Sequence, residues 1–155
     1  MGRLLLPVTL VAAALVLATA AGATPPTPIG GYEAITGGTA TVTRVADGNT
    51  FVANHLTGTI GGSFTGTFTA DYTAIVHPSG ATNIVGGTFV CTCSFEGRTG
   101  TLTFRFTGSG TAAGVTEIQA ESIGGTGGLA NLHSNLGGQV VGAAVTYAGT
   151  AHFDP

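Results

Sequence analysis

Residues 64–76 alternate between two kinds of side chain, and this pattern constrains the fold more than any other feature of the chain. One face of this segment is polar: it carries threonines, Asp71 and, just beyond the segment, His77. Ile75 is the one apolar residue on that face. Successive side chains of a β-strand point to opposite faces, so a period of two predicts a strand with one buried and one solvated face. The opposite, buried face carries Phe64, Gly66, Phe68, Ala70, Tyr72, Ala74 and Val76.

The same period recurs along the chain, and no segment has the period of an amphipathic helix. Pro78, Ser79 and Gly80 form a turn, after which residues 82–89 return as a strand with a bulge at the Gly86-Gly87 pair. Strong alternation also predicts strands around residues 101–107 and 145–153. Weaker strands are expected at residues 39–45, 50–60, 115–123 and 138–144, which brings the total to about eight.

We therefore expect an all-β fold, a closed antiparallel β-barrel of about eight strands, with a β-sandwich as the alternative. Large inward residues alternate with glycine and alanine, as the taper of a small barrel requires. Charged residues make up only 7% of the chain, too few to guard exposed sheet edges against pairing with other chains. Closure into a barrel removes those edges, which favours the barrel over the sandwich.

The N-terminus has the features of a secretory signal peptide, residues 1–23. Arg3 precedes an apolar run at residues 4–17, and small residues follow with A-x-A cleavage choices after Ala20 or Ala23. The run is shorter than the roughly 20 apolar residues that span a bilayer. We expect the protein to be secreted, with no integral membrane segment after removal of the signal. Residues 24–38, rich in proline and glycine, are expected to be an extended tail, and residues 39–155 the barrel domain.

Charge argues against a nucleic-acid partner. The chain has no lysine, and residues 24–155 carry three arginines against seven carboxylates, a formal charge of −4. Binding to a phosphate backbone requires clustered cationic side chains, and the sequence has no such cluster. The partners that remain are a small apolar ligand and further copies of the chain. No cofactor is predicted.

Three glycine-rich segments share a common pattern of turns and strands: LTGTIGG at residues 56–62, FEGRTGTL at residues 95–102 and GGTGGLANL at residues 124–132. In this order they resemble the allene-oxide-cyclase-like β-barrel superfamily, which includes dirigent-like relatives in plants, and in particular its uncharacterised bacterial branch. The resemblance implies an eight-stranded antiparallel barrel with an apolar lumen, often assembled as dimers or trimers, but it implies no particular reaction. Asn131 and Ser134 depart from the pattern, because glycines would be expected there.

Cys91 and Cys93 are the two cysteines, and an exported chain meets oxidising conditions. Residues i and i+2 of a flat strand lie about 6.6 Å apart, whereas the Cβ atoms of bonded cysteines lie about 3.5 to 4.5 Å apart. We expect an intramolecular disulfide to need a bulge or turn at Thr92. Free buried thiols, an intermolecular bridge and a soft-metal site are the alternatives, although two thiolates alone do not complete a metal site.

Other polar residues give little indication of catalysis. The four histidines are scattered without metal-binding spacing, and surface positions are expected for them. Glu117 and Glu121 share a strand face about 13 Å apart, too far for a glycosidase pair at about 5 to 9.5 Å, so both are expected to face solvent. No G-x-S-x-G elbow is present, which argues against a serine hydrolase. The sequence predicts no catalytic residue and no metal ligand.

Candidate ligand contacts come from the inward faces of the strands. Arg44 shares the alternation of Ala40 and Val42, and Asn54 that of its apolar neighbours, so both could point inward as polar contacts to a ligand. The alternative for Arg44 is a rim position paired with Asp47 or Glu33. Tyr72 and Tyr147 either anchor the core or orient a ligand. The full candidate set is Phe68, Tyr72, Phe104, Tyr147, Arg44 and Asn54.

Three functions are compatible with these features. The first is a non-enzymatic secreted barrel that binds a small apolar molecule in its lumen. The second is a cyclase-like or dirigent-like enzyme in which Arg44 or Glu117 polarises the substrate. The third is a barrel filled by its own side chains that acts through its threonine-rich outer surface, since eight strands are close to the size that side chains alone can fill.

Overall fold

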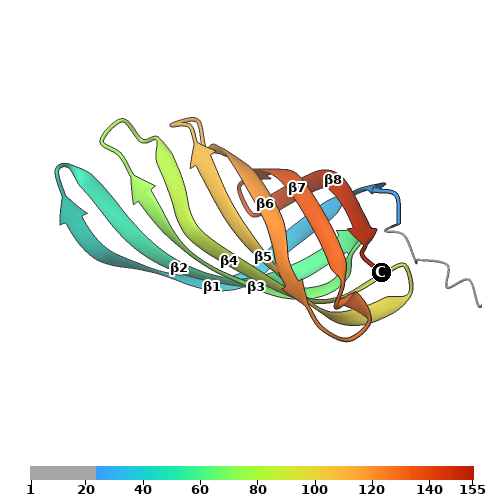
Figure 1. Cartoon of the computed structure of the whole chain (residues 1–155). Coiled ribbons are helices and arrows are strands. Elements are labelled where there is room, and N and C mark those ends of the chain that lie inside the picture. The colour runs from blue at the N-terminus through green and yellow to red at the C-terminus, as the bar shows by residue number, and fades with distance from the viewer. Residues whose placement is uncertain (1–23) are drawn as a thin grey trace, which may run out of the picture.

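The computed structural model describes residues 24–155 and shows a closed barrel of eight antiparallel strands in sequence order (Figure 1). The predicted signal peptide, residues 1–23, lies outside the described residues. Each strand pairs with the next, and β8 pairs with β1 to close the sheet. The strands are β1 (Thr27–Ala46), β2 (Asn49–Gly62), β3 (Thr65–Val76), β4 (Thr82–Phe95), β5 (Arg98–Gly110), β6 (Val115–Gly125), β7 (Leu132–Val141) and β8 (Ala144–Phe153).

The all-β barrel predicted from the alternation is confirmed. Apolar residues of one parity are buried, and the threonines between them are mostly exposed. The predicted bulge is also present: Gly86 adopts a positive φ of 63°, and the pairing of β4 with both neighbouring strands shifts at this point. An extra residue interrupts the alternation and bends the strand, and glycine takes this backbone conformation without a steric penalty.

Two boundaries predicted from the sequence are wrong. Residues 27–38 are part of β1 and not a tail, because Thr27 to Ala34 pair with β8 and Gly31 onward with β2. Pro28 suggested a tail, but a proline is tolerated near the start of a strand, where a missing N–H interrupts few ladder bonds. The seventh strand begins at Leu132, six residues before the predicted start at residue 138.

One half of the barrel interior is closed by aromatic and aliphatic side chains. Phe64 packs against Phe95, Phe104 and Tyr147, with ring centroids 5.1 to 6.3 Å apart. A short 3₁₀ helix, η1 (Gly127–Leu129), inserts the fully buried Leu129 beneath β5. Two of the glycine-rich segments meet here, since Thr126 bonds both the amide and the hydroxyl of Thr101. The closed end is therefore a solid core.

The other end carries the β1–β2, β3–β4, β5–β6 and β7–β8 turns, and the β1–β2 hairpin extends furthest (Figure 1). β1 pairs with β8 only as far as Ala34 and continues for twelve residues paired with β2 alone. Among residues 24–155, no helix has the length and apolarity needed to cross a bilayer. The interior is thus built as a filled closed end and a second half that opens towards the hairpins.

Candidate ligand-binding cavity

A cavity of about 270 Å³ occupies the half of the barrel above the aromatic core. It is bounded at its inner end by Phe104 and Tyr147, and it reaches Thr116 and Gly142 near the hairpin turns. Apolar side chains from all eight strands form most of the wall. They include Ile35, Leu56, Ile60, Phe68, Ala70, Ile84, Phe89, Phe106, Ile118, Leu136 and Val145. The space is close to the lower end of the range of small-molecule sites, about 300 to 1,000 Å³.

Four of the six residues predicted as ligand contacts line this cavity. Phe68 and Tyr72 come from β3, Phe104 from β5 and Tyr147 from β8. Phe68 stacks on Phe89 of the neighbouring strand at a centroid distance of 4.8 Å. Because these rings belong to different strands that converge only in the closed sheet, barrel closure is what brings them together.

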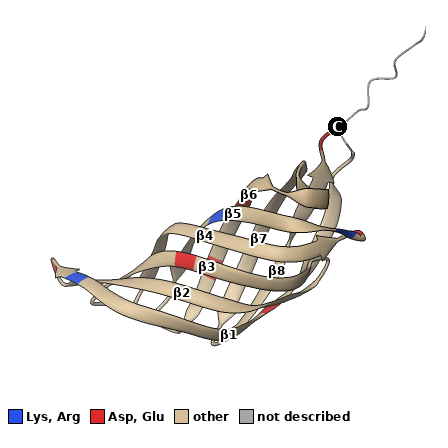
Figure 2. Ribbon diagram, turned by 90° about the horizontal axis from the view of Figure 1, so that it is seen from below, with Lys and Arg blue, Asp and Glu red and all other residues tan. Residues whose placement is uncertain are grey.

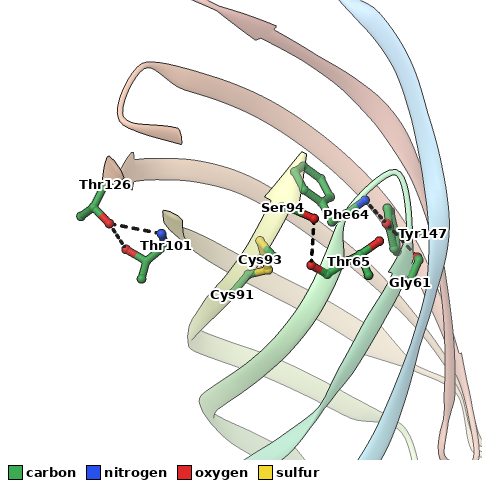
Figure 3. Close-up of a disulfide and its surroundings, with 9 residues drawn as sticks. All are labelled: Gly61, Phe64, Thr65, Cys91, Cys93, Ser94, Thr101, Thr126 and Tyr147. Carbon is green, nitrogen blue, oxygen red and sulfur yellow. Dashed lines mark hydrogen bonds between the residues drawn. A yellow bond between two sulfur atoms is a disulfide. The ribbon is translucent and has the colours of Figure 1, made fainter. Parts of the chain in front are cut away.

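The Tyr147 hydroxyl has a structural role as well as a place in the wall. It donates a hydrogen bond to the Gly61 carbonyl at 3.1 Å and accepts one from the Phe64 N–H at 3.2 Å (Figure 3). Burial raises the pKa of Tyr147 above its usual 10, an effect opposed by the Phe64 hydrogen bond and increased by the negative charge of Glu33. The hydroxyl is therefore fixed between the ends of β2 and β3 and is already hydrogen-bonded.

One of the residues that line the cavity, Glu33, is charged, and it is not among the ligand contacts predicted from the sequence. It lies on β1 opposite Ile60 of β2 and Val145 of β8, both buried. Burial in this apolar wall raises the pKa of Glu33 to about 7. The signal that could have located it is the alternation of Ile29, Gly31, Glu33 and Ile35, which puts the carboxyl on an apolar face, but the proline and glycine content of residues 24–38 predicts a tail there.

Arg44 does not line the cavity, so the inward one of the two positions predicted for it is wrong. The pairing of β1 with β2 shifts between Val42 and Arg44, so Thr43 is an extra residue that reverses the alternation. Arg44 consequently lies on the outer face with its guanidinium 3.9 Å from the centre of the Phe51 ring. The alternative pairing with Asp47 or Glu33 is absent from the ion pairs of residues 24–155.

Asn54 keeps the inward parity of β2 but is not part of the cavity wall. It lies opposite Ala40 and Tyr72, nearer the hairpin end, and its amide donates to the Val52 carbonyl at 3.0 Å. Of the six predicted contacts, Arg44 and Asn54 are thus the two that do not line the cavity. The cavity therefore lacks the two polar contacts predicted from Arg44 and Asn54, and Glu33 is its charged residue instead.

Cys91 and Cys93 form a disulfide on the inner face of β4 (Figure 3). The predicted need for a bulge or turn at Thr92 is wrong, because the pairing with β3 and β5 continues without a shift through this residue. The two Cα atoms lie 5.5 Å apart, closer than on a flat strand and within the range usual for bonded cysteines. Both residues are buried among the aromatic side chains of the closed end.

The histidines and the two glutamates of β6 lie outside the cavity wall. His55 pairs with Asp71 at 2.7 Å, and His133 and His152 both approach Asp154. Within residues 24–155, no group of histidine, cysteine and acidic side chains is arranged to hold a metal ion.

Glu117 and Glu121 are exposed on β6, as predicted, and Gln139 donates to the Glu117 carboxylate at 2.8 Å. Charged residues are sparse over the rest of the barrel and form no continuous patch in the view of Figure 2. The charge on Glu33 is therefore the electrostatic feature that distinguishes the cavity.

Comparison with known proteins supports the fold of the chain but assigns it no function. No family model matches the chain, and no curated protein matches it. Its structure is similar to the crystal structure of a protein of unknown function from the DUF3224 family of Shewanella oneidensis MR-1, with a TM-score of 0.71. The two sequences are 16% identical, and the match covers 84% of this chain and 100% of the other.

Proposed function

We propose that the protein binds a small, largely apolar molecule in the barrel lumen. The observation that carries this proposal is the cavity of about 270 Å³ with a predominantly apolar wall, directly above a core that is otherwise well filled. Transfer of an apolar ligand from water into such a site is favoured by about 25 cal/mol for each Å² of apolar surface buried.

The contrast between the two halves of the interior supports binding over a purely structural barrel. In the closed half, Phe64, Leu102 and Leu129 leave almost no exposed surface. In the other half, Ala120 and Gly138 face the space without a bulky side chain, and a cavity of about 270 Å³ remains. The chain therefore fills one half of its interior and leaves space in the other.

The cyclase-like or dirigent-like alternative required Arg44 or Glu117 to polarise a substrate in the lumen. Arg44 lies on the outer face because of the bulge at Thr43, and Glu117 is exposed on the outside of β6. Neither can contact a molecule in the lumen. Non-enzymatic binding is accordingly the function that the geometry favours.

Isothermal titration with n-octanol tests the proposal. We expect saturable binding with one molecule per chain and weaker binding by Ala120→Phe, which places a ring in the cavity wall. Ala148→Phe adds the same ring at an exposed position on β8 and serves as the matched control. Equal affinity in all three proteins, or no binding by the parent chain, would contradict binding in the lumen.

We also propose that the protein is exported before it binds its ligand. Cleavage after Ala23 would make Thr24 the first residue. Thr24 is hydrogen-bonded to the backbone of Phe153 at 2.8 to 3.1 Å. All eight strands lie beyond the cleavage choices, and a disulfide is common in exported proteins. N-terminal sequencing of protein from a culture supernatant tests this, with Ala21 or Thr24 expected as the first residue.

A further inference from the structure

Glu33 introduces an ionisable group into an otherwise apolar cavity. The other lining residues with polar side chains are Tyr72, Thr116 and Tyr147. None of the three arginines of residues 24–155 lines the cavity: Arg44 stacks on Phe51 and Arg98 on Phe153, both on rings, while Arg105 is exposed on β5.

The carboxyl also has no protein partner. The hydrogen bonds and ion pairs of residues 24–155 include none to the Glu33 side chain. Removing a carboxylate from water costs several kcal/mol unless an opposite charge or hydrogen-bond donors compensate it. The Tyr147 hydroxyl, whose residue also lines the cavity, already donates to Gly61. Compensation for the charge must therefore come from water or from a molecule in the lumen.

We propose that the lumen takes an amphipathic cation, a ligand with an apolar body and one protonated amine, and that the amine pairs with the Glu33 carboxylate. This inference rests on the proposed binding function and adds the chemical class of the ligand. The apolar body lies in the cavity against Phe68, Phe89 and Phe104, while the ammonium replaces the water that the carboxylate lost on burial. The same carboxylate excludes fatty-acid-like anions, because two negative charges would share one apolar site.

The surroundings of Glu33 make this selectivity depend on pH. The titratable groups of the cavity wall are Tyr147 on β8 and Tyr72 on β3, and burial raises both pKa values above 10, so both remain neutral near neutral pH. From β2 the wall contributes Leu56 and Ile60, which do not titrate. Glu33 itself changes charge near pH 7, so acidification removes the anion that the amine requires.

The test is a titration with three ligands of equal chain length, n-octylamine, n-octanol and n-octanoate, at about pH 8 and about pH 5. We expect octylamine to bind at least about tenfold more tightly than octanol at the higher pH, and octanoate more weakly than either. At the lower pH the preference for the amine should fall, because Glu33 is then protonated.

Glu33→Gln keeps the size of the side chain and removes its charge, and it should abolish the preference for octylamine over octanol. Glu117→Gln removes the same charge from the outer surface of β6 and should keep the preference. If octanol and octylamine bind equally to the parent chain, or if Glu33→Gln retains the preference, the ligand class is wrong while lumen binding stands. If no member of the series binds, the proposed function itself is contradicted.

Discussion

At the scale of single residues, Glu33 is the group whose environment differs most from its ordinary one. Its pKa is raised from 4.5 to about 7 by burial in an apolar wall. The folded chain therefore binds the Glu33 proton more tightly than the unfolded chain does. By linkage, the contribution of this residue to stability is full below about pH 4.5 and is lost progressively as the pH rises towards 7.

We predict that Glu33→Gln stabilises the protein above neutral pH and changes little below about pH 4.5. A shift from 4.5 to about 7 corresponds to at most about 3 kcal/mol, which sets the upper limit of the gain. Urea unfolding of both proteins across this pH range measures it. If the parent chain instead gains stability relative to the variant between pH 5 and pH 8, ionisation of the Glu33 carboxyl costs the folded state little, and the prediction is wrong.

Tyr147 provides a second prediction at this scale. Tyr147→Phe removes one hydroxyl and leaves the Phe64 amide without its acceptor in a buried position. An unsatisfied buried donor costs about 1 to 3 kcal/mol, so the midpoint of chemical denaturation should fall accordingly. Tyr32→Phe, which removes a hydroxyl from a largely exposed side chain, is the control and should change little. An unchanged midpoint in Tyr147→Phe would indicate that water replaces the hydroxyl.

At the scale of strands and turns, bulges decide which side chains enter the lumen. The extra residue at Thr43 turns Arg44 outward, and the bulge at Gly86 returns Phe89 to the inner face. Two hairpins close through paired residues with positive φ, Asp47-Gly48 and Glu96-Gly97. This is the backbone of the tight turns that suit the twist of antiparallel strands.

A glycine comparison tests the turn geometry. Gly97 has a φ of 75° and nothing within 4 Å of an added Cβ, so Gly97→Ala meets only the backbone penalty of the left-handed region. That penalty is about 1 to 2 kcal/mol. Gly124 has equal space and no positive φ, so Gly124→Ala should be nearly neutral in thermal unfolding. Equal losses in the two variants would contradict the assigned turn.

The strands and their inward faces were predictable because alternation is a local property of the sequence. Phe68, Tyr72, Phe104 and Tyr147 could be placed in the lumen from parity alone, and they line the cavity. Arg44 could not be placed correctly, since one extra residue reverses parity without leaving a glycine or proline as a signal. Glu33 was missed because the prolines before it suggested a tail, and only pairing with β8 makes residues 27–34 a strand.

At the scale of the whole molecule, the barrel separates its packed core from the cavity. The closed end holds the disulfide, η1 and the aromatic cluster, whereas the cavity faces the hairpin end. Replacing Phe64, which is 1% exposed and contacts three rings, by alanine should cost about 3 to 5 kcal/mol. Chemical denaturation measures this, and a loss below about 1 kcal/mol would place the core elsewhere.

The part of β1 that is not paired with β8 is a candidate site for assembly between chains. Beyond Ala34, β1 has β2 on one side only, and Val42 and Val45 are 59% and 68% exposed. An uncovered strand edge with few charges is a favourable position for pairing between chains. The homo-oligomer expected from the sequence stays a prediction, and sedimentation of the parent chain and of a Val42→Lys variant would measure it.

The central claim is that the lumen holds an amphipathic ligand with its charged group at Glu33. A crystal structure of the protein grown with n-octylamine near pH 8 tests it most directly. The account predicts density for the alkyl chain in the cavity against Phe68, Phe89 and Phe104, with the nitrogen within hydrogen-bond distance of the Glu33 carboxylate. A lumen filled by rearranged side chains, or an amine bound only on the outer surface, would contradict it.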